Sequence, residues 1–285
     1  MVVEVAASRL GAAVLAPAAG AANAIEEESV VQAVSYEVVD RVAHVMIERP
    51  EVRNAMDLEV FDQLASHAER VASDPAVGAV VVAGRGGTFS SGLDLSVLGT
   101  LGEVDTALIA RLQASFTAYE ELEVPVIAAI EGYCFGGGVQ LALACHLRGV
   151  ASSAELAVME ARWGLVPDLG GTYRLPRLVG LGRATELTLS ARRVPAPEAL
   201  AIGLAEVSLS DDDPLGHAHE LAAQLAAGPG ALRRIPRLLR ENLGRSRADA
   251  LAAEAQAQLA GLAGGDVAEA VTAHLEGRQP RFSGR

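Results

Sequence analysis

Alternating apolar and polar residues predict that the ordered chain opens with a β-hairpin. Residues 36–47 form two alternating runs around a turn near Asp40 and Arg41. Successive side chains of a strand point to opposite faces, so such runs indicate strands with one buried face. Residues 57–72 then carry apolar side chains at helical spacing, and Asp57 can cap the first turn of this helix. The chain therefore opens with a ββα unit.

Further apolar runs predict a strand, loop and helix pattern that recurs along the chain. The predicted elements are strands over residues 77–83, 124–130 and 156–159 and helices over residues 106–122 and 136–145. The first two strands are continuously apolar, as in sheets that are buried on both faces. From Pro197 onward the pattern is helical almost throughout. We therefore predict an α/β core over residues 33–210 and a helical C-terminal region over residues 211–285.

The first residues differ in composition from the rest of the chain. Residues 10–24 are apolar and rich in small side chains, like a weak signal peptide. Only Arg9 precedes this run in the basic region that such a peptide needs, and Pro17 and Gly20 interrupt it. A disordered extension over residues 1–32 explains the composition better than export does.

Charge and composition exclude several classes of protein. The 36 acidic and 23 basic side chains give a formal net charge of −13, which opposes general nucleic-acid binding. No apolar run approaches the roughly 20 residues of a membrane-spanning helix. Two cysteines, Cys134 and Cys145, make neither a disulfide framework nor a zinc site, and they fit a reducing, cytoplasmic setting. The close pair His217 and His219 would face different sides of a helix, so no metal is expected.

Two glycine-bearing loops after buried strands are the first candidates for a site. In residues 89–94, Gly92 permits a tight turn, so that the amide of Leu93 can face a cavity. In residues 136–138, three glycines precede a helix whose first amides lack intrahelical acceptors. Two N–H groups aimed at one point would form an oxyanion hole for acyl chemistry. The alternative is that the glycines merely permit close packing of a helix on a strand.

The order of four segments resembles the crotonase superfamily, also called the enoyl-CoA hydratase/isomerase family, over about residues 34–280. The segments are residues 48–56, 89–95, 125–138 and 164–175. The resemblance implies a crotonase-like spiral of ββα repeats with a helical C-terminal region that builds homotrimers or dimers of trimers. It also implies an acyl-CoA thioester as substrate, so that coenzyme A is part of the substrate and no separate cofactor is expected.

The same resemblance assigns the binding residues. The amides of Leu93 and Gly137 would hold the thioester oxygen and stabilise an enolate. The remaining predicted substrate-binding residues are Val52, Arg53, Ser91, Gly92, Asp94 and Gln140. Arg53 would meet the phosphates of coenzyme A, with Arg85 as a weaker alternative, because an acidic protein must hold an anion locally. Asp94 could instead hold its loop by bonding to backbone amides.

Acidic side chains decide the reaction, and here the sequence departs from the hydratase pattern. Hydratases of this family use two glutamates, and the first of these positions is Gln140, which cannot be a base. The second is Glu160, and Asp168 stands where the dienoyl-CoA isomerase branch has an aspartate. That branch has a further carboxylate at the position of Gln140, so this chain keeps two of its three acids. Two carboxylates share water addition well, whereas a proton shift between two carbons needs only one base. We therefore predict an enoyl-CoA or dienoyl-CoA isomerase with Glu160 and Asp168 as catalytic residues.

Several alternatives stay open at this point. Glu160 could be a surface carboxylate that pairs with Arg162, and Asp168 could close an Asx turn. Gln140 could cap its helix or hydrogen-bond a water or the thioester region. The chain could also be an enoyl-CoA hydratase, or an acyl-CoA-binding protein with little catalytic activity. The alanine-rich C-terminal helices suit subunit packing, and a row of arginines over residues 233–240 suits a solvated face.

Overall fold

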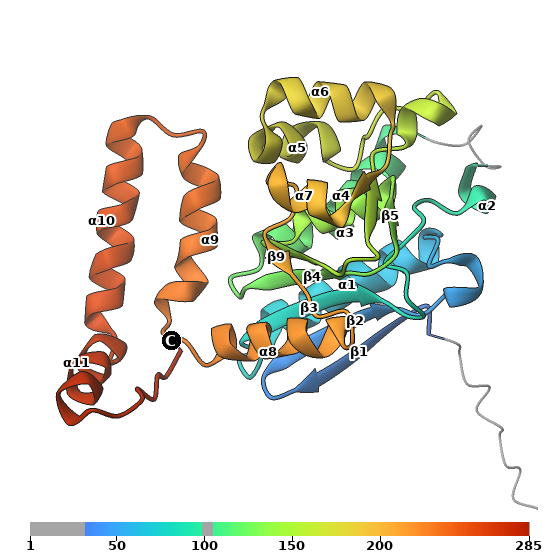
Figure 1. The fold of residues 1–285 in the computed structure, drawn as a ribbon. Helices are drawn as coiled ribbons and strands as arrows, with labels where there is room; N and C mark the ends of the chain where they lie inside the picture. Colours follow the sequence, from blue (N-terminus) through green and yellow to red (C-terminus); the bar gives the residue numbers. More distant parts are fainter. Residues whose placement is uncertain (1–31, 99–104, 285) are drawn as a thin grey trace, which may run out of the picture. The chain divides into compact units, whose positions relative to one another are not determined.

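A computed structural model describes residues 32–98 and 105–284 of the chain. The predicted extension over residues 1–32 lies outside this part except for Gln32. Two sheets and the helices around them make up the described chain (Figure 1).

The larger sheet has six strands in the order β1-β2-β3-β4-β6-β9. They are β1 (Val34–Val39), β2 (Val42–Ile47), β3 (Ala79–Gly84), β4 (Val126–Ile130), β6 (Leu147–Val150) and β9 (Val207–Ser208). The hairpin of β1 and β2 is antiparallel and its turn is at Asp40 and Arg41, as predicted. Every other pairing in this sheet is parallel, so the carboxyl ends of β2, β3, β4 and β6 meet at one edge.

Both faces of this sheet are buried, which explains the continuous apolar runs. Val80 and Val82 of β3 join the core beneath α1 (Leu58–Ser73) and α3 (Thr106–Glu121). Ala79 and Val81 point to the other face and join a second apolar cluster with α8 (Pro214–Ala226). Since α8 follows residue 210, the sheet is covered on this face by a helix from the region predicted to be C-terminal.

The smaller sheet continues the fold beside the first. It consists of β5 (Tyr133–Phe135), β7 (Glu155–Ala157) and β8 (Val194–Pro195) in the order β5-β7-β8. The helices between these strands are α4 (Gly137–Ala144), α5 (Gly171–Val179) and α6 (Leu181–Ser190), and α7 (Ala196–Ala201) follows β8. The strand predicted over residues 156–159 begins one residue earlier and ends at Ala157, because Val158 and Met159 lead into a short 3-10 helix at Glu160–Trp163.

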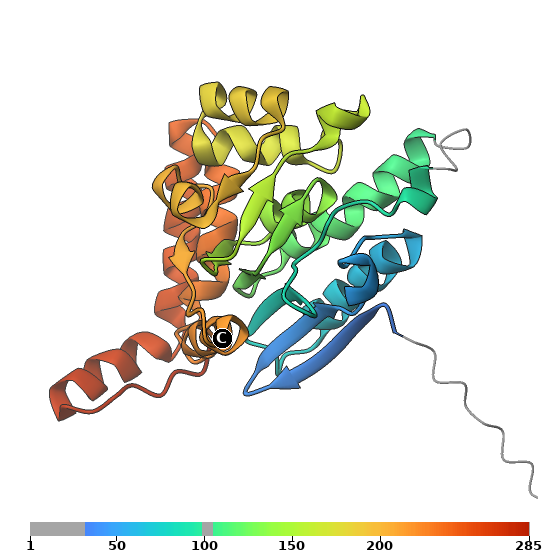
Figure 2. The ribbon, with the colours of Figure 1, turned by 45° about the vertical axis from the view of Figure 1, so that its right-hand side comes forward.

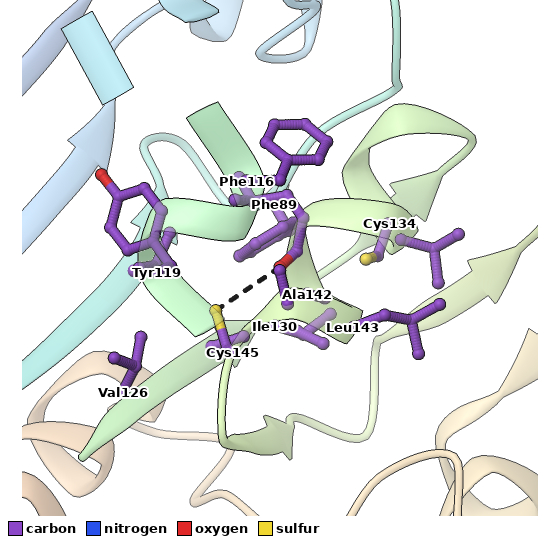
Figure 3. Close-up of a cluster of buried hydrophobic side chains, with 14 of the residues drawn as sticks. Phe89, Phe116, Tyr119, Val126, Ile130, Cys134, Ala142, Leu143 and Cys145 are labelled. Carbon is purple, nitrogen blue, oxygen red and sulfur yellow. Dashed lines mark hydrogen bonds between the residues drawn. The ribbon is translucent and has the colours of Figure 1, made fainter. Parts of the chain in front are cut away.

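Both cysteines lie in the larger apolar cluster, as the sequence favoured (Figure 3). Cys145 belongs to the same cluster as Phe116, Tyr119 and Leu143, and its thiol donates to the Leu141 carbonyl at 3.5 Å. Burial raises the pKa of the Cys145 thiol to about 12. Both thiols are therefore packing groups of the core.

Three helices form the C-terminal part of the chain. They are α9 (Ala231–Asn242), α10 (Arg247–Ala263) and α11 (Asp266–Glu276), and α9 and α10 lie side by side (Figures 1 and 2). The arginines of α9 are not simply a solvated face, since Arg233 donates to the carbonyls of Gly284 and Val77 and Arg240 donates to that of Glu120. Within residues 32–98 and 105–284 no helix is long and apolar enough to cross a membrane.

Candidate active site

The predicted site residues come together because their loops follow parallel strands. The 3-10 helix Pro50–Val52 follows β2, the loop with Gly92 follows β3, and the glycine loop follows β5. Glu160 follows β7, which is parallel to β5. Carboxyl ends of parallel strands commonly form ligand sites, because the loops that follow them converge there.

The two glycine loops touch each other where the oxyanion hole is predicted. Gly92 has a φ of +102°, and a methyl group built on it would lie 2.8 Å from the Phe135 carbonyl oxygen and 3.4 Å from the Gly137 nitrogen. A methyl group on Gly137 would lie 3.8 Å from the Leu93 nitrogen. Only glycine readily allows the conformation and the close approach at Gly92. At Gly137 the tight neighbour of such a methyl group would be Met56 Cε, at 2.8 Å.

The amides of Leu93 and Gly137 are available to a ligand. Met56 pairs with the extended loop around Leu93: its amide donates to the Gly92 carbonyl, and its carbonyl accepts from the Asp94 amide. The Leu93 amide lies between these two bonds and points away from Met56. Gly137 is the first residue of α4, where an amide has no intrahelical acceptor. In the described part of the chain, neither amide donates to a backbone or side-chain acceptor. Their role in holding a thioester oxygen stays a prediction.

These loops surround a cavity of about 670 Å³. Every predicted site residue contributes to its wall, namely Val52, Arg53, Ser91, Gly92, Leu93, Asp94, Gly137, Gln140, Glu160 and Asp168. The wall also contains apolar side chains that the sequence analysis did not single out, among them Leu95, Met159, Trp163 and Leu165. The volume falls in the range of ordinary small-molecule sites.

Glu160 is buried in this wall and does not pair with Arg162 at the surface. Only 8% of the residue is exposed, and Oε1 accepts a hydrogen bond from Gln140 Nε2 at 2.7 Å. Oε2 is buried and has no hydrogen-bond partner among the described residues. Burial raises the pKa of the Glu160 carboxyl, while the backbone of Glu160 and then the bond from Gln140 oppose this rise. A carboxyl with a raised pKa is a better general base near neutral pH.

Asp168 lies on the loop that leads into α5, and its charge contributes to the raised pKa of Glu160. The residue as a whole is exposed, yet partial burial of its carboxyl raises the pKa of Asp168 as well. Its backbone carbonyl accepts from Gln113 Nε2 at 2.5 Å. The site therefore holds two carboxyls whose pKa values both shift toward neutrality.

Asp94 holds its own loop, in line with the alternative that the sequence left open. Its carboxylate accepts from the Ser96 amide at 2.9 Å and from Arg49 Nη1 at 3.0 Å. These bonds, with the Ser96 amide contributing most, lower the pKa of Asp94. Arg49 also contacts Asp57 at 3.1 Å, so it ties the loop to the start of α1. The sequence analysis missed Arg49, because its partners are distant along the chain.

The two arginines considered for coenzyme A have different surroundings. Arg53 is exposed at the cavity beside Val52, with its guanidinium 5.6 Å from the centre of the Tyr133 ring. Arg85 makes two hydrogen bonds to Glu48, at 2.8 and 2.9 Å, and it does not line the cavity. The geometry therefore favours Arg53 over Arg85 as a ligand for phosphates.

The histidines do not form a metal cluster in the described part of the chain. His219 contacts His44 with a nitrogen-to-nitrogen distance of 2.9 Å, whereas His217 accepts from the Ser210 amide. Among residues 32–98 and 105–284, no group of three His, Cys, Asp or Glu side chains could hold a metal ion.

Comparison with known proteins identifies the family. The family model described as enoyl-CoA hydratase/isomerase matches residues 37–285. The chain belongs to this family. It is 35% identical over 256 residues to a Bacillus subtilis protein described as a probable enoyl-CoA hydratase, with 88% of this chain and 99% of the relative covered.

Two further relatives of this enoyl-CoA hydratase/isomerase family member bear on its chemistry. The mitochondrial Delta(3,5)-Delta(2,4)-dienoyl-CoA isomerase of Mus musculus is 39% identical over 200 residues, which cover 65% of this chain and 61% of the mouse protein. A candidate enoyl-CoA hydratase from Thermobifida fusca, solved in complex with acetoacetyl-CoA, has a TM-score of 0.76 at 36% identity, covering 81% and 95% of the two chains. The crotonase resemblance and the predicted fold class are thus confirmed, and the protein is an enzyme of a family whose members include both hydratases and isomerases.

Proposed function

We propose that the protein is an isomerase that shifts a double bond of an enoyl-CoA or dienoyl-CoA thioester. One observation carries the proposal: the buried carboxyl of Glu160 has the neutral amide of Gln140 as its neighbour, 2.7 Å away, where a hydratase would have a second acid. An amide neither takes up nor releases a proton near neutral pH, so Glu160 is the base of this pair.

The reaction is a transfer of one proton between two carbons of the substrate. Glu160 removes a proton from C2 of a 3-enoyl thioester, and the electron pair moves onto the thioester oxygen. The amides of Leu93 and Gly137 donate to this oxygen and stabilise the enolate. Protonated Glu160 then returns the proton to C4, which leaves a 2-enoyl thioester and restores the carboxylate.

A dienoyl substrate would use both carboxyls of the site. Asp168 faces the same cavity as Glu160, and both groups have a raised pKa. One carboxyl can then remove a proton while the other delivers a proton at the far end of the longer conjugated system. The similarity to the mouse dienoyl-CoA isomerase supports this version of the reaction.

Coenzyme A would bind beside Val52 and Arg53, at the exposed part of the cavity. The complex of the Thermobifida fusca relative with acetoacetyl-CoA supports an acyl-CoA ligand. The C-terminal helices would join subunits into a trimer or a dimer of trimers. Their exposed apolar side chains support this assembly: Leu251, Leu259, Leu262, Val267, Val271 and Leu275.

The experiment that tests the proposal supplies three thioesters to the purified protein. These are 2-enoyl-CoA in water, 3-enoyl-CoA and 3,5-dienoyl-CoA, followed by mass spectrometry and by diene absorbance. We expect migration of the double bond without a gain of water. Glu160→Gln should lower kcat by about 10²–10⁴-fold, the usual contribution of a general base. Glu220→Gln, at an exposed position of α8, is the matched control.

Two results would overturn the proposal. Hydrated product from 2-enoyl-CoA, lost in Glu160→Gln, would make the protein a hydratase, as the Bacillus subtilis relative is described. Binding of all three thioesters without turnover would make it an acyl-CoA-binding protein.

A further inference from the structure

The buried side chain of Gln140 links the segment that carries Glu160 to the segment that carries Asp168. Only 1% of the residue is exposed. Its Oε1 accepts from the amides of Leu169 at 2.8 Å and Gly171 at 2.9 Å, and its Nε2 donates to Glu160 Oε1 at 2.7 Å. The polar atoms of Gln140 thus bind the backbone at the start of α5 and the carboxyl of Glu160, and they do not cap α4.

The two backbone amides fix the orientation of the Gln140 side chain. A flipped amide would turn its NH₂ group toward two N–H donors and its oxygen toward a carboxylate, which would lose all three hydrogen bonds. The site is also crowded, because a methyl group on Gly171 would lie 2.8 Å from Gln140 Oε1. The backbone of the loop that carries Asp168 therefore holds the Gln140 amide with its NH₂ group facing Glu160.

This orientation gives the two carboxyl oxygens of Glu160 different hydrogen-bonding surroundings. Oε1 is occupied by Gln140 and lies near Gly136, where a methyl group would stand 3.5 Å away. Oε2 is buried without a partner among the described residues. A buried oxygen without a hydrogen bond is costly unless a ligand completes its surroundings.

We infer that Gln140 is a positioning residue that fixes Glu160 so that Oε2 is the atom that takes the proton from substrate. The inference rests on the proposed function, in which Glu160 is the base. Gln140 acts through Glu160 and not on the reacting carbons. It also holds the Asp168 loop at a constant distance from the base, since the same amide bonds to both.

The donation from Gln140 has a measurable electrostatic consequence. It stabilises the charged form of Glu160 and so opposes the rise in the pKa of Glu160 that burial causes. Removing the donor, and leaving the acceptor in place, should therefore make Glu160 hold its proton to higher pH.

Gln140→Glu makes this change, keeps the length of the side chain and places a second carboxyl beside Glu160. A carboxylate oxygen can still accept from the amides of Leu169 and Gly171, whereas the second oxygen now faces Glu160 Oε1 and cannot donate unless it is protonated. The matched control is Gln63→Glu in α1. Gln63 Oε1 accepts from the Val34 amide at 2.6 Å and its Nε2 donates to Glu59 at 2.9 Å. Gln63 thus also bridges a backbone amide and a glutamate, with one amide in place of two, and it does not line the cavity.

The test compares the pH profiles of kcat/KM for the wild type and both variants with 3-enoyl-CoA. We expect the acidic limb of the Gln140→Glu profile to move to higher pH by about one pH unit or more. At pH 6, kcat/KM of this variant should then be about tenfold or more below that of the wild type. The profile of Gln63→Glu should match that of the wild type. An acidic limb that stays in place in Gln140→Glu would overturn the inference.

A second measurement separates this inference from the proposed function. Inactivity of the wild type, or full activity of Glu160→Gln, would refute the proposed function whatever Gln140 does. Carbon-13 NMR titration of the Glu160 carboxyl follows its pKa without any substrate. A pKa that rises in Gln140→Glu and not in Gln63→Glu supports the positioning role, and an unchanged pKa refutes it.

Discussion

Arg49 and Asp94 join the end of β2 to the loop that presents the Leu93 amide, with Arg49 Nη1 3.0 Å from Asp94 Oδ2. The same guanidinium donates to the Ala55 carbonyl at 2.5 Å and lies 3.1 Å from Asp57 Oδ2. One planar side chain thus bonds to three points of the site, which a single ammonium group cannot reproduce.

Arg49→Lys should destabilise the protein although it keeps the charge. We expect a loss of about 1–3 kcal/mol in the free energy of unfolding, because hydrogen bonds to one carboxylate and one carbonyl and an ion pair with a second carboxylate are disturbed. Urea denaturation measures this loss. Arg111→Lys should cost much less, because its pair with Asp62 is exposed to solvent. Equal losses in the two variants would contradict the role given to Arg49.

Gly92→Ala should lower activity more than it lowers stability. The new methyl group would lie 2.8 Å from the Phe135 carbonyl at a φ of +102°, so the loop must shift and the Leu93 amide must move with it. Loss of one oxyanion donor typically lowers kcat by about 10²–10³-fold. Steady-state kinetics with 3-enoyl-CoA check this expectation. Gly182→Ala, where a methyl group meets nothing within 4 Å, should leave kcat unchanged.

Acidification should destabilise the contact between β2 and α8. Burial, and then the neighbouring His219, lower the pKa of His44 in the folded protein. The unfolded chain therefore binds a proton first as the pH falls below about 6.5, and stability decreases from there downward. Glu37 and Asp40 also face this pair and partly offset the effect.

Chemical denaturation at pH 7.5 and 5.5 measures this dependence. His44→Gln should lose less stability between the two pH values than the wild type, whereas His274→Gln, at an exposed position of α11, should behave like the wild type. A loss in His44→Gln equal to that of the wild type would show that the pair does not cause the dependence.

The cysteines should resist alkylation until the protein unfolds. The thiolate is the reactive form. Burial raises the pKa of Cys145 to about 12 and holds the pKa of Cys134 well above its usual range. Iodoacetamide at pH 8 should therefore modify neither residue of the folded protein and both in urea, as counted by mass spectrometry. Rapid labelling of the folded protein would contradict the packing that Figure 3 shows.

Local signals were sufficient to predict most of the fold. Asp57 caps α1 by accepting from the Val60 amide at 3.0 Å, and the turn at Asp40 and Arg41 separates two strands, both as predicted. The strand β6 was missed because it carries Arg148, whose buried guanidinium pairs with Glu206. Arg148 interrupts the apolar pattern that would indicate a buried strand, and its partner Glu206 lies 58 residues away in the sequence, so the pairing cannot be predicted from neighbouring residues.

In the site, too, local features could be predicted from the sequence, whereas contacts between distant residues could not. Its glycine loops are visible in the sequence, because only glycine meets the local demands of conformation and space. The bond between Gln140 and Glu160 is not visible, since it depends on how α4 and the segment after β7 are brought together. The resemblance to the crotonase superfamily predicted residues that line the cavity, and only the three-dimensional structure relates one side chain to another.

The separation between the two apolar clusters and the loops at the carboxyl edge of the sheet has an evolutionary consequence. Folding depends mainly on the clusters that cover the two faces of the sheet, whereas Glu160, Asp168 and Gln140 stand outside both of them. An exchange of Gln140 for Glu keeps the length of the side chain and an acceptor for the amides of Leu169 and Gly171, so it changes the chemistry of the site and leaves both apolar clusters intact. Such a scaffold can acquire new reactions by single substitutions.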